Sequence, residues 1–266
     1  MRIATWNVNS VRTRLTHLTT WLTANPIEVV CLQETKVVDA DFPRQSLEAL
    51  GYHVYPAGQK AYNGVALLSR QPLDDVHVGF SALLPAGRVG DLDDQKRLIR
   101  GVLGSRQVLN VYIPNGSAVD SEKYAYKLAW LTALRDYLDA LLTQTPDLAL
   151  CLCGDFNIAP DDRDIHDPVG KDDHIMASPL ERQALQQITS LGLLDGFRHF
   201  TPETGHYTWW DYRAAAFRRN QGWRIDHHYL TPALAAQAQN CWIDRTPRSW
   251  PQPSDHAPVL LELAQG

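Results

Sequence analysis

The feature that most constrains the fold is a series of short apolar runs with helical or loop segments between them. The eight runs span residues 2–8, 27–33, 63–69, 98–103, 107–113, 147–154, 224–230 and 257–263. Runs 27–33 and 147–154 are nearly continuous in apolar residues, as strands buried on both faces are. The chain is therefore expected to adopt an α/β or mixed α+β fold.

Two helices are predicted from apolar residues at steps of three and four. The first spans residues 121–142, with Ser121 as its N-cap. Its apolar positions are Tyr124, Leu128, Leu131, Leu134, Leu138 and Leu141. The second has Ser178 as N-cap, Glu181 closing a capping box, and Gly192 as its stop. Both helices should lie against a sheet.

Length and composition are those of an ordinary globular protein. The chain has 266 residues, of which 44% are hydrophobic and 21% charged. No Pro-, Gly- or Ser-rich linker divides it, so residues 1–266 are expected to form a single domain. The first residues lack the apolar segment of a signal peptide, and no apolar run approaches the length of a membrane span. We expect a cytoplasmic protein without membrane contact.

The cysteines favour the same compartment. They are Cys31, Cys151, Cys153 and Cys241. None forms a C-x-x-C pair, and three lie within apolar runs. Buried free thiols in a reducing compartment explain this pattern better than zinc ligands or disulfides.

The charge pattern leaves a nucleic-acid partner open. A net charge of -5 does not indicate one, because release of counterions favours basic surfaces. Basic residues nevertheless cluster in two segments, and these are Lys96, Arg97 and Arg100, then Arg213, Arg218, Arg219 and Arg224. A basic binding face on an acidic protein is one interpretation of these clusters.

Polar side chains stand repeatedly at the ends of the predicted strands. They are Asn7, Asn9, Glu34, Asp155, Asn157, Asp226, Asp255 and His256. Each alone could be a turn former, a satisfied buried acid or a core histidine. Burying a bare carboxylate costs several kcal/mol unless it is paired or coordinates a metal. Their repetition therefore favours one shared site.

The donor types narrow the chemistry of that site. Carboxylate and amide oxygens suit a hard cation such as Mg²⁺ or Mn²⁺, whereas zinc prefers His and Cys at characteristic spacings. Glu34 is the first candidate ligand. The sequence has no G-x-S-x-G, P-loop, G-x-G-x-x-G or H-E-x-x-H motif. His227 and His228 are adjacent in a strand, so they point to opposite faces and cannot share a site. Metal-assisted hydrolysis of a phosphoester remains.

Eight ordered motifs carry a resemblance to a known family. They are TWNVNSVR, LQETK, YNGVALLSR, VYIPNG, GDFNIAP, TWWDYR, GWRIDH and SDHAPV. Together they resemble the exonuclease III family of apurinic/apyrimidinic (AP) endonucleases, within the endonuclease/exonuclease/phosphatase superfamily, from Ile3 to Leu263. The resemblance implies a four-layered sandwich of two packed mixed β-sheets flanked by helices. It also implies a monomer that acts on damaged or nicked duplex DNA.

The same resemblance implies roles for individual residues. Metal binding falls to Glu34, with Asn7 beside or just behind it, and the wider candidate set adds Asp255, His256, Asp155 and Asn157. Asp155 would orient or deprotonate the attacking water, and Asn157 would hold the phosphate and that aspartate. Tyr112 would hydrogen-bond the phosphate, with Asn115 close by. Asp226 would fix and polarise His256, which would stabilise charge on the phosphoryl oxygens.

A lesion pocket is implied as well. Trp209, Trp223 and Ile225 match positions that enclose an abasic sugar or a 3' terminal nucleotide in this family, although a tryptophan beside a strand can equally be core. Since Trp209 and Trp210 are adjacent, only one should face the pocket. Four basic residues would be phosphate contacts or solvated charges: Arg218, Arg219, Lys123 and Lys127.

One departure from the family suggests a preference among substrates. The segment 167–182 carries Asp172, Asp173 and the bulky Met176 where the family lays a loop against DNA. Because like charge repels phosphates, we expect 3' ends to be favoured over internal AP sites. Two other functions stay open: a superfamily phosphatase acting on a non-DNA phosphoester, and a DNA-binding protein that has lost catalysis.

Overall fold

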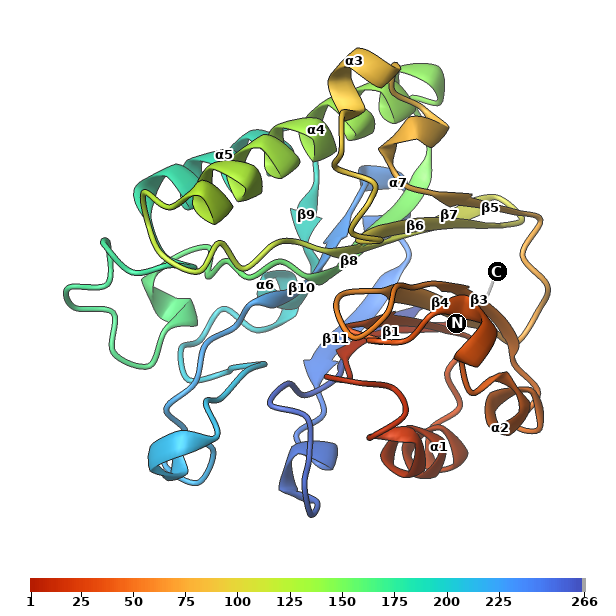
Figure 1. The fold of residues 1–266 in the computed structure, drawn as a ribbon, viewed down its shortest axis with the longest axis horizontal. Coiled ribbons are helices and arrows are strands. Elements are labelled where there is room, and N and C mark those ends of the chain that lie inside the picture. Colours follow the sequence, from red (N-terminus) through yellow and green to blue (C-terminus); the bar gives the residue numbers. More distant parts are fainter. Residues whose placement is uncertain (265–266) are drawn as a thin grey trace.

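The computed structural model describes residues 1–264, and its centre is a pair of six-stranded sheets (Figure 1). The first sheet has the order β11-β12-β1-β2-β4-β3. Its strands are β1 (Arg2–Asn7), β2 (Val29–Gln33), β3 (His53–Ala57), β4 (Val65–Ser69), β11 (Ala238–Ile243) and β12 (Val259–Leu263). The second sheet has the order β5-β6-β7-β8-β10-β9. Its strands are β5 (Asp75–Val78), β6 (Leu98–Leu103), β7 (Arg106–Tyr112), β8 (Ala149–Asp155), β9 (Leu194–Asp195) and β10 (Asp226–Leu230).

Helices cover the outer faces of both sheets. Figure 1 shows α1 and α2 outside the first sheet and α3, α4 and α5 outside the second. The α-helices are α1 (Leu15–Ala24), α2 (Arg44–Glu48), α3 (Ala86–Val89), α4 (Glu122–Gln144), α5 (Pro179–Thr189), α6 (Gly196–Phe200) and α7 (Pro232–Ala235). Five 3-10 turns complete the described elements: η1 (Asp39–Asp41), η2 (Phe80–Ala82), η3 (Asp162–Asp164), η4 (Arg213–Ala215) and η5 (Pro247–Ser249). The predicted four-layered sandwich is confirmed.

Strand β2 illustrates why the central runs are apolar on both faces. Val29 and Cys31 pack between the two sheets, whereas Val30 and Leu32 pack on the other side, with α1 and α2. Successive side chains of a strand point to opposite faces, so a strand covered on both faces must be apolar throughout. The same alternation places all four cysteines, buried and free, in the layer between the sheets.

The two predicted helices form with the expected caps. The Ser121 side chain accepts a hydrogen bond from Tyr124 N at the start of α4, and Ser178 and Glu181 form the capping box of α5. Leu128 of the predicted apolar stripe is only half-buried. Helix α5 ends at Thr189, and Gly192 adopts a φ of 94° in the turn that follows, a conformation glycine accepts without strain. Within residues 1–264, no helix has both the length and the apolar character of a membrane span.

Strand direction explains where the polar strand ends meet. Strands β1 and β2 are parallel, and so are β7 and β8, so their carboxyl ends lie at one end of each sheet. The antiparallel strand β10 starts there, because Asp226 pairs with Asp155 across the ladder. Strand β12 runs antiparallel to β1, which brings the residues before Val259 to the end of β1. Polar residues from distant segments therefore meet at one place.

Candidate active site

A pocket of about 260 Å³ lies where these strand ends meet. Its lining comes from segments spread over most of the chain: Glu34, Tyr112, Asn115, Asn157, Met176, Trp209, Ile225, Asp255 and His256. Asn7, Asp155 and Asp226 are buried just behind this lining. Trp223 lines a neighbouring pocket of about 290 Å³, which shares Met176 and Trp209 with the first. The residues predicted for catalysis, metal binding and lesion binding are thus brought together, apart from Arg218, which is exposed on a flanking segment.

Asn7 bridges the two acidic residues of the site. Its Nδ2 donates to Glu34 Oε1 at 2.8 Å and to Asp155 Oδ2 at 2.9 Å, while its Oδ1 accepts from Asn9 N at 3.0 Å. Lys36, which the sequence analysis did not single out, pairs with Glu34 Oε2 at 2.7 Å. Burial by itself would raise the pKa of Glu34, but Lys36 and Asn7 together lower it below its usual value. Glu34 is therefore ionised.

His256 and Asp155 form the centre of the polar cluster. His256 Nδ1 lies 2.9 Å from Asp226 Oδ2, and His256 Nε2 lies 3.8 Å from Asp155 Oδ2. Burial alone would lower the pKa of His256, but the charges of Asp226 and Asp155 raise it to about 10. Burial raises the pKa of Asp155 to about 7, although His256 acts in the opposite direction. The predicted pairing of His256 with the distant Asp226 is confirmed as geometry.

Asn157 holds Asp155 and is itself held by Asn115. Asn157 N donates to Asp155 Oδ1 at 2.9 Å, and Asn157 Oδ1 accepts from Asn115 Nδ2 at 3.0 Å. Asn157 holds a φ of 50°, a left-handed conformation that asparagine tolerates better than most residues.

Burial and the charge of Glu34 raise the pKa of Tyr112 well above that of a free phenol. Tyr112 is therefore a hydroxyl donor throughout the neutral range.

Asp255 and His256 diverge as the extended backbone requires. Asp255 Oδ1 accepts from Asn9 Nδ2 at 3.1 Å, and Asp255 Oδ2 accepts from Trp209 Nε1 at 3.0 Å. These two hydrogen bonds fix the indole of Trp209 at the edge of the pocket. Trp210 points the other way, is 0% exposed and packs edge-on against Phe217. The expectation that one tryptophan of this pair faces the pocket is therefore confirmed.

An apolar cluster forms the wall opposite the charges. It contains Ala159, Ile165, Met176, Ala177, Trp223 and Ile225, with Trp209 packed against it. His174 stacks at a tilt on Trp223, with 5.1 Å between ring centroids. The pocket thus has one acidic and cationic wall and one apolar, aromatic wall. Such a space suits a phosphoryl group on one side and a sugar without a base on the other.

Two groups in the described part of the chain have the spacing to hold a metal ion. In the site, Glu34, Asp155 and His256 place ligand atoms within 4.8 Å of one another. Cys151, Cys153 and His228 form the other group, but they are fully buried between the sheets. His227 bonds to Ile158 O and His228 to Val259 O, on opposite faces of β10. The two histidines point to opposite faces and do not share a site, as predicted, and neither of them lines the pocket.

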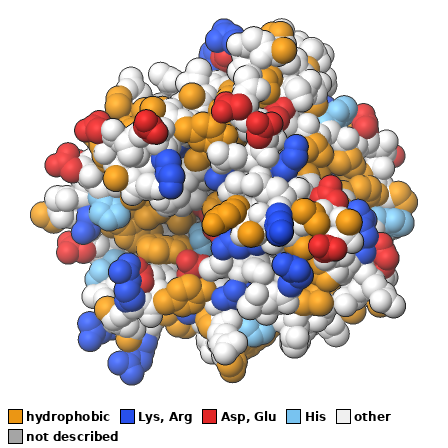
Figure 2. All heavy atoms as spheres, in the orientation of Figure 1, with side chains coloured by type: hydrophobic (Ala, Val, Ile, Leu, Met, Phe, Trp, Pro, Cys, Tyr) orange, Lys and Arg blue, Asp and Glu red, His pale blue; other side chains and the backbone are white. Residues whose placement is uncertain are grey.

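The structure corrects the interpretation of several basic residues. Arg97, Arg100 and Arg224 are buried, so they do not form a basic surface. Lys127 is 0% exposed and pairs with Glu181, so it is neither a phosphate contact nor a solvated charge. Of the basic residues singled out in the sequence, Lys123, Arg213, Arg218 and Arg219 are exposed. Figure 2 shows basic side chains gathered at the lower left, over the segment that contains η4.

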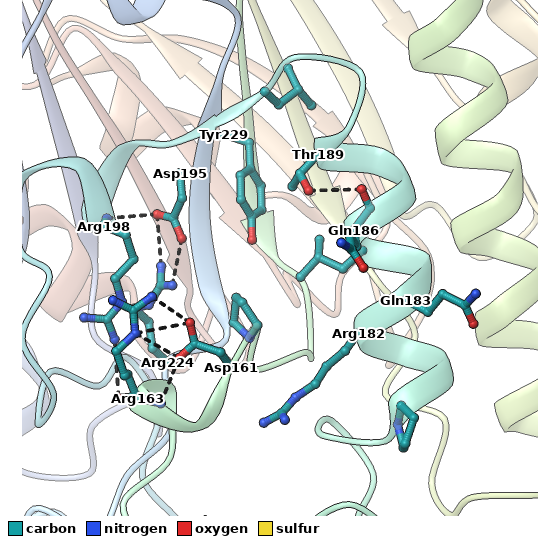
Figure 3. A pocket seen from close by; sticks show the side chains of 14 residues that line it. Asp161, Arg163, Arg182, Gln183, Gln186, Thr189, Asp195, Arg198, Arg224 and Tyr229 are labelled. Atoms are coloured by element: carbon teal, nitrogen blue, oxygen red, sulfur yellow. Dashed lines mark hydrogen bonds and ion pairs between the residues drawn. The ribbon is translucent and has the colours of Figure 1, made fainter.

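A larger pocket, of about 510 Å³, lies between α5 and β10 and holds none of the predicted site residues (Figure 3). Arginine–aspartate pairs line it. Arg224 pairs with Asp195 at 2.7 Å and with Asp164 at 2.6 Å, and Arg163 pairs with Asp161 at 2.7 Å. Arg224 lies between Trp223 and Ile225 in the chain, so this network holds the segment that carries part of the aromatic wall.

Comparison with known proteins agrees with this geometry. Residues 4–256 match the model of the Endonuclease/Exonuclease/phosphatase family. The chain is 33% identical to exodeoxyribonuclease III of Haemophilus influenzae, covering 99% of this chain and 100% of the relative. It resembles the solved structure of 3' phosphatase NExo from Neisseria bound to product DNA hairpin, with 42% identity, a TM-score of 0.93 and full coverage of both chains. An AP endonuclease from Archaeoglobus fulgidus is similar at 38% identity and a TM-score of 0.91, over 99% of both chains. The chain therefore belongs to the Endonuclease/Exonuclease/phosphatase family and, within it, to the exonuclease III family of AP endonucleases.

Proposed function

We propose that this protein is a Mg²⁺-dependent DNA repair nuclease that hydrolyses phosphoester bonds at AP sites and 3' ends of duplex DNA. The observation that carries the proposal is the arrangement of Asp155 and His256. Their side chains lie 3.8 Å apart beside Glu34, at a pocket whose other wall is aromatic. The relatives named exodeoxyribonuclease III and 3' phosphatase support the same reaction class.

Asp155 is the proposed base. A pKa near 7 lets it accept a proton from water at neutral pH, and Asn157 N holds its Oδ1 in place. In the reaction, the water oxygen bonds to phosphorus and the water proton passes to Asp155. The phosphorus–oxygen ester bond breaks, and the leaving oxygen takes a proton from solvent and departs as an alcohol. His256 stays cationic at neutral pH because its pKa is about 10, so it stabilises the developing charge on the phosphoryl oxygens. The Tyr112 hydroxyl donates a hydrogen bond to the same oxygens and keeps its proton.

The proposed metal ligands are Glu34 and Asp155, with His256 beside them. Carboxylate oxygens fit a hard divalent cation, and Asp255 and Asn157 lie at the same pocket. Asn7 turns its amide nitrogen toward both carboxylates, so we place it just behind the ligands, where it orients them. When bound, Mg²⁺ or Mn²⁺ would polarise the phosphoryl oxygens and offset negative charge.

The proposed substrate is DNA rather than a small phosphoester. Trp209, Trp223 and Ile225 form an apolar wall that a soluble phosphate monoester would not require. Arg218, with its basic neighbours, would contact the phosphate backbone beside the pocket. Both sheets contribute residues to the one site, so we propose that residues 1–266 act as one domain and as a monomer. Four buried free thiols suit the reducing cytoplasm.

We further propose that 3'-end processing is favoured over AP-site incision. Met176 is buried against Trp223 and Ile225 and lines the pocket, so its bulk narrows the space for an extruded sugar. Asp172 and Asp173 are exposed nearby, where their charge would repel the phosphates of a continuous duplex. Met176 also adopts a φ of 73°, so Met176→Gly removes bulk without adding backbone strain.

Three duplexes with an internal AP site, a recessed normal 3' end and a 3'-phosphate test the proposal. We expect hydrolysis with Mg²⁺, none with EDTA, and the fastest turnover at 3' ends. His256→Ala and Asp155→Asn should abolish activity while the circular dichroism spectrum stays unchanged. Met176→Gly should raise AP incision relative to 3'-phosphate removal. Near-normal turnover by either catalytic-site variant contradicts the assignment, and equal wild-type rates at AP sites and 3' ends contradict the preference.

A further inference from the structure

The ammonium of Lys127 lies completely buried behind the site. It forms an ion pair with Glu181 of α5, and both side chains are 0% exposed. Its Nζ also donates to the backbone carbonyls of Asn157 at 2.7 Å and Asn115 at 3.1 Å. An ammonium has three N–H donors, and these three acceptors match all of them. Two of the three acceptors belong to asparagines that line the pocket.

Glu181 fixes the neighbouring segment. Its Oε2 accepts from Ser178 N at 3.1 Å and Ser178 Oγ at 2.6 Å, as in a capping box. Its Oε1, which pairs with Lys127, also accepts from Met176 N at 3.1 Å. Helix capping does not require this last contact. Glu181 therefore holds the residue that narrows the pocket as well as the start of α5.

The two segments joined by this pair both contain strained backbone. Asn157 has a φ of 50° and Met176 a φ of 73°, in the left-handed region that residues other than glycine rarely adopt. Such conformations persist only where surrounding contacts enforce them. Lys127 binds the carbonyl of Asn157, and Glu181 binds the amide of Met176. A further hydrogen bond, from Ala159 N to Met176 O at 2.7 Å, joins the same two segments.

Stability does not account for a buried ion pair at this position. Removing two charges from water is costly, and uncharged residues of similar volume are often at least as stabilising. What an uncharged pair would lack is the ability to hold four backbone groups in three segments at once. The contacts of Lys127 and Glu181 fix the positions of these backbone groups rather than add to the folding free energy.

We propose that Lys127 and Glu181 form a positioning pair that sets the phosphate-contacting asparagines relative to Met176 and thereby favours 3' ends over internal AP sites. This inference rests on the proposed function, whose substrates it uses. Neither residue touches substrate. The pair acts through Asn115 and Asn157 on one side and through Met176 on the other.

The test compares Lys127→Met with the double variant Lys127→Met/Glu181→Gln. The single variant leaves Glu181 buried without its partner, so its melting temperature should fall. The double variant has no charge at either of these two buried positions and should recover most of that loss. Arg135→Met on the same helix α4 is the matched control, because Arg135 pairs with Asp136 on the surface. For each protein, kcat and KM are measured on the 3'-phosphate duplex and on the AP duplex.

In the folded double variant, kcat/KM on the 3'-phosphate duplex should fall about tenfold to a hundredfold, because small misplacements of binding groups carry costs of this size. The loss should be smaller on the AP duplex, so the ratio of AP incision to 3'-phosphate removal rises. A double variant with wild-type kinetics on both substrates, or with equal losses on both, overturns the inference. Wild-type protein inert on every duplex instead overturns the proposed function, and the inference with it.

Discussion

Asp226 accepts a hydrogen bond from His256 across 2.9 Å, between Oδ2 and Nδ1, and this pair joins residues 30 positions apart. Since Nδ1 carries its proton toward Asp226, the other ring nitrogen, Nε2, faces Asp155. The pair thus sets both the charge and the direction of the imidazole.

Asp226→Asn should disable the enzyme without unfolding it. The amide keeps the shape of the carboxylate but removes the charge that raises the pKa of His256, so that pKa should fall from about 10. Loss of kcat by about 10³–10⁴-fold is expected, as for the equivalent change behind a catalytic histidine in a hydrolase triad. An NMR titration of the His256 ring measures the change in pKa, and turnover on a 3'-phosphate duplex measures the loss of kcat. A variant with an unchanged ring pKa or turnover within fivefold of wild type would contradict the assignment.

Lys36→Met should tighten binding of Mg²⁺ to the protein without DNA. Lys36 Nζ lies 2.7 Å from Glu34 Oε2 and so competes with a cation for that carboxylate. A charge pair of this kind is worth about 1 kcal/mol where it is exposed to water, which corresponds to roughly fivefold in affinity. Isothermal titration calorimetry measures the change directly. Lys60→Met, on an exposed side chain, serves as control, and equal affinities of both variants would count against the competition.

Arg224→Met should cost more stability than any single surface ion pair. Its guanidinium is buried between Asp164 and Asp195, so the substitution leaves Asp195 without its ion-pair partner and Asp164 with Arg198 alone. Breaking a buried pair from one side costs about 3–5 kcal/mol, whereas an exposed pair contributes about 1 kcal/mol or less. Unfolding in guanidinium chloride measures the free energy of unfolding of Arg224→Met and of Arg163→Met. The second variant breaks the exposed pair with Asp161 and serves as the comparison. Similar losses in both variants would contradict it.

His227 should make the protein sensitive to acid. Burial and Arg224 lower the pKa of His227 to about 4, so the folded state binds this proton less readily than the unfolded state. Well above pH 6.5, His227 is neutral in both states and does not affect the free energy of unfolding. As the pH falls from 6.5 toward 4, His227 lowers that free energy progressively, by about 2 kcal/mol between pH 7 and 5. Urea unfolding at both pH values should reveal this loss in wild type relative to His227→Gln. The raised pKa of His256 acts in the opposite direction but is common to both proteins, so equal pH slopes would refute the effect.

How much of the fold the sequence predicted depended on where each strand lies in its sheet. The eight apolar runs correspond to β1, β2, β4, β6, β7, β8, β10 and β12, and these are the interior strands of the two sheets. Strands β3, β5, β9 and β11 were missed, and they are the four edges. An interior strand is covered on both faces and must be apolar, whereas an edge strand tolerates polar residues, and β3 even contains Pro56.

The sequence by itself determined the types of side chain available to the site and the strand ends that carry them. Local rules also sufficed for the divergence of Asp255 from His256 and of Trp209 from Trp210, since adjacent residues in extended backbone point to opposite sides. The motif resemblance supplied the long-range pairing of His256 with Asp226. Local sequence patterns cannot predict such pairs, because the pairs depend on the order of the strands in the sheets.

Only the tertiary structure decided which charged residues face solvent. Lys127 and Arg224 were grouped with basic surface residues because other basic residues lie a few positions away in the sequence, yet both are buried in ion pairs. A charged side chain can enter the interior when a partner from another element meets it there. Glu181 lies 54 residues from Lys127, and Asp164 lies 60 residues from Arg224. Burial of these charges is therefore a property of the packed helices and loops, which no local window of sequence contains.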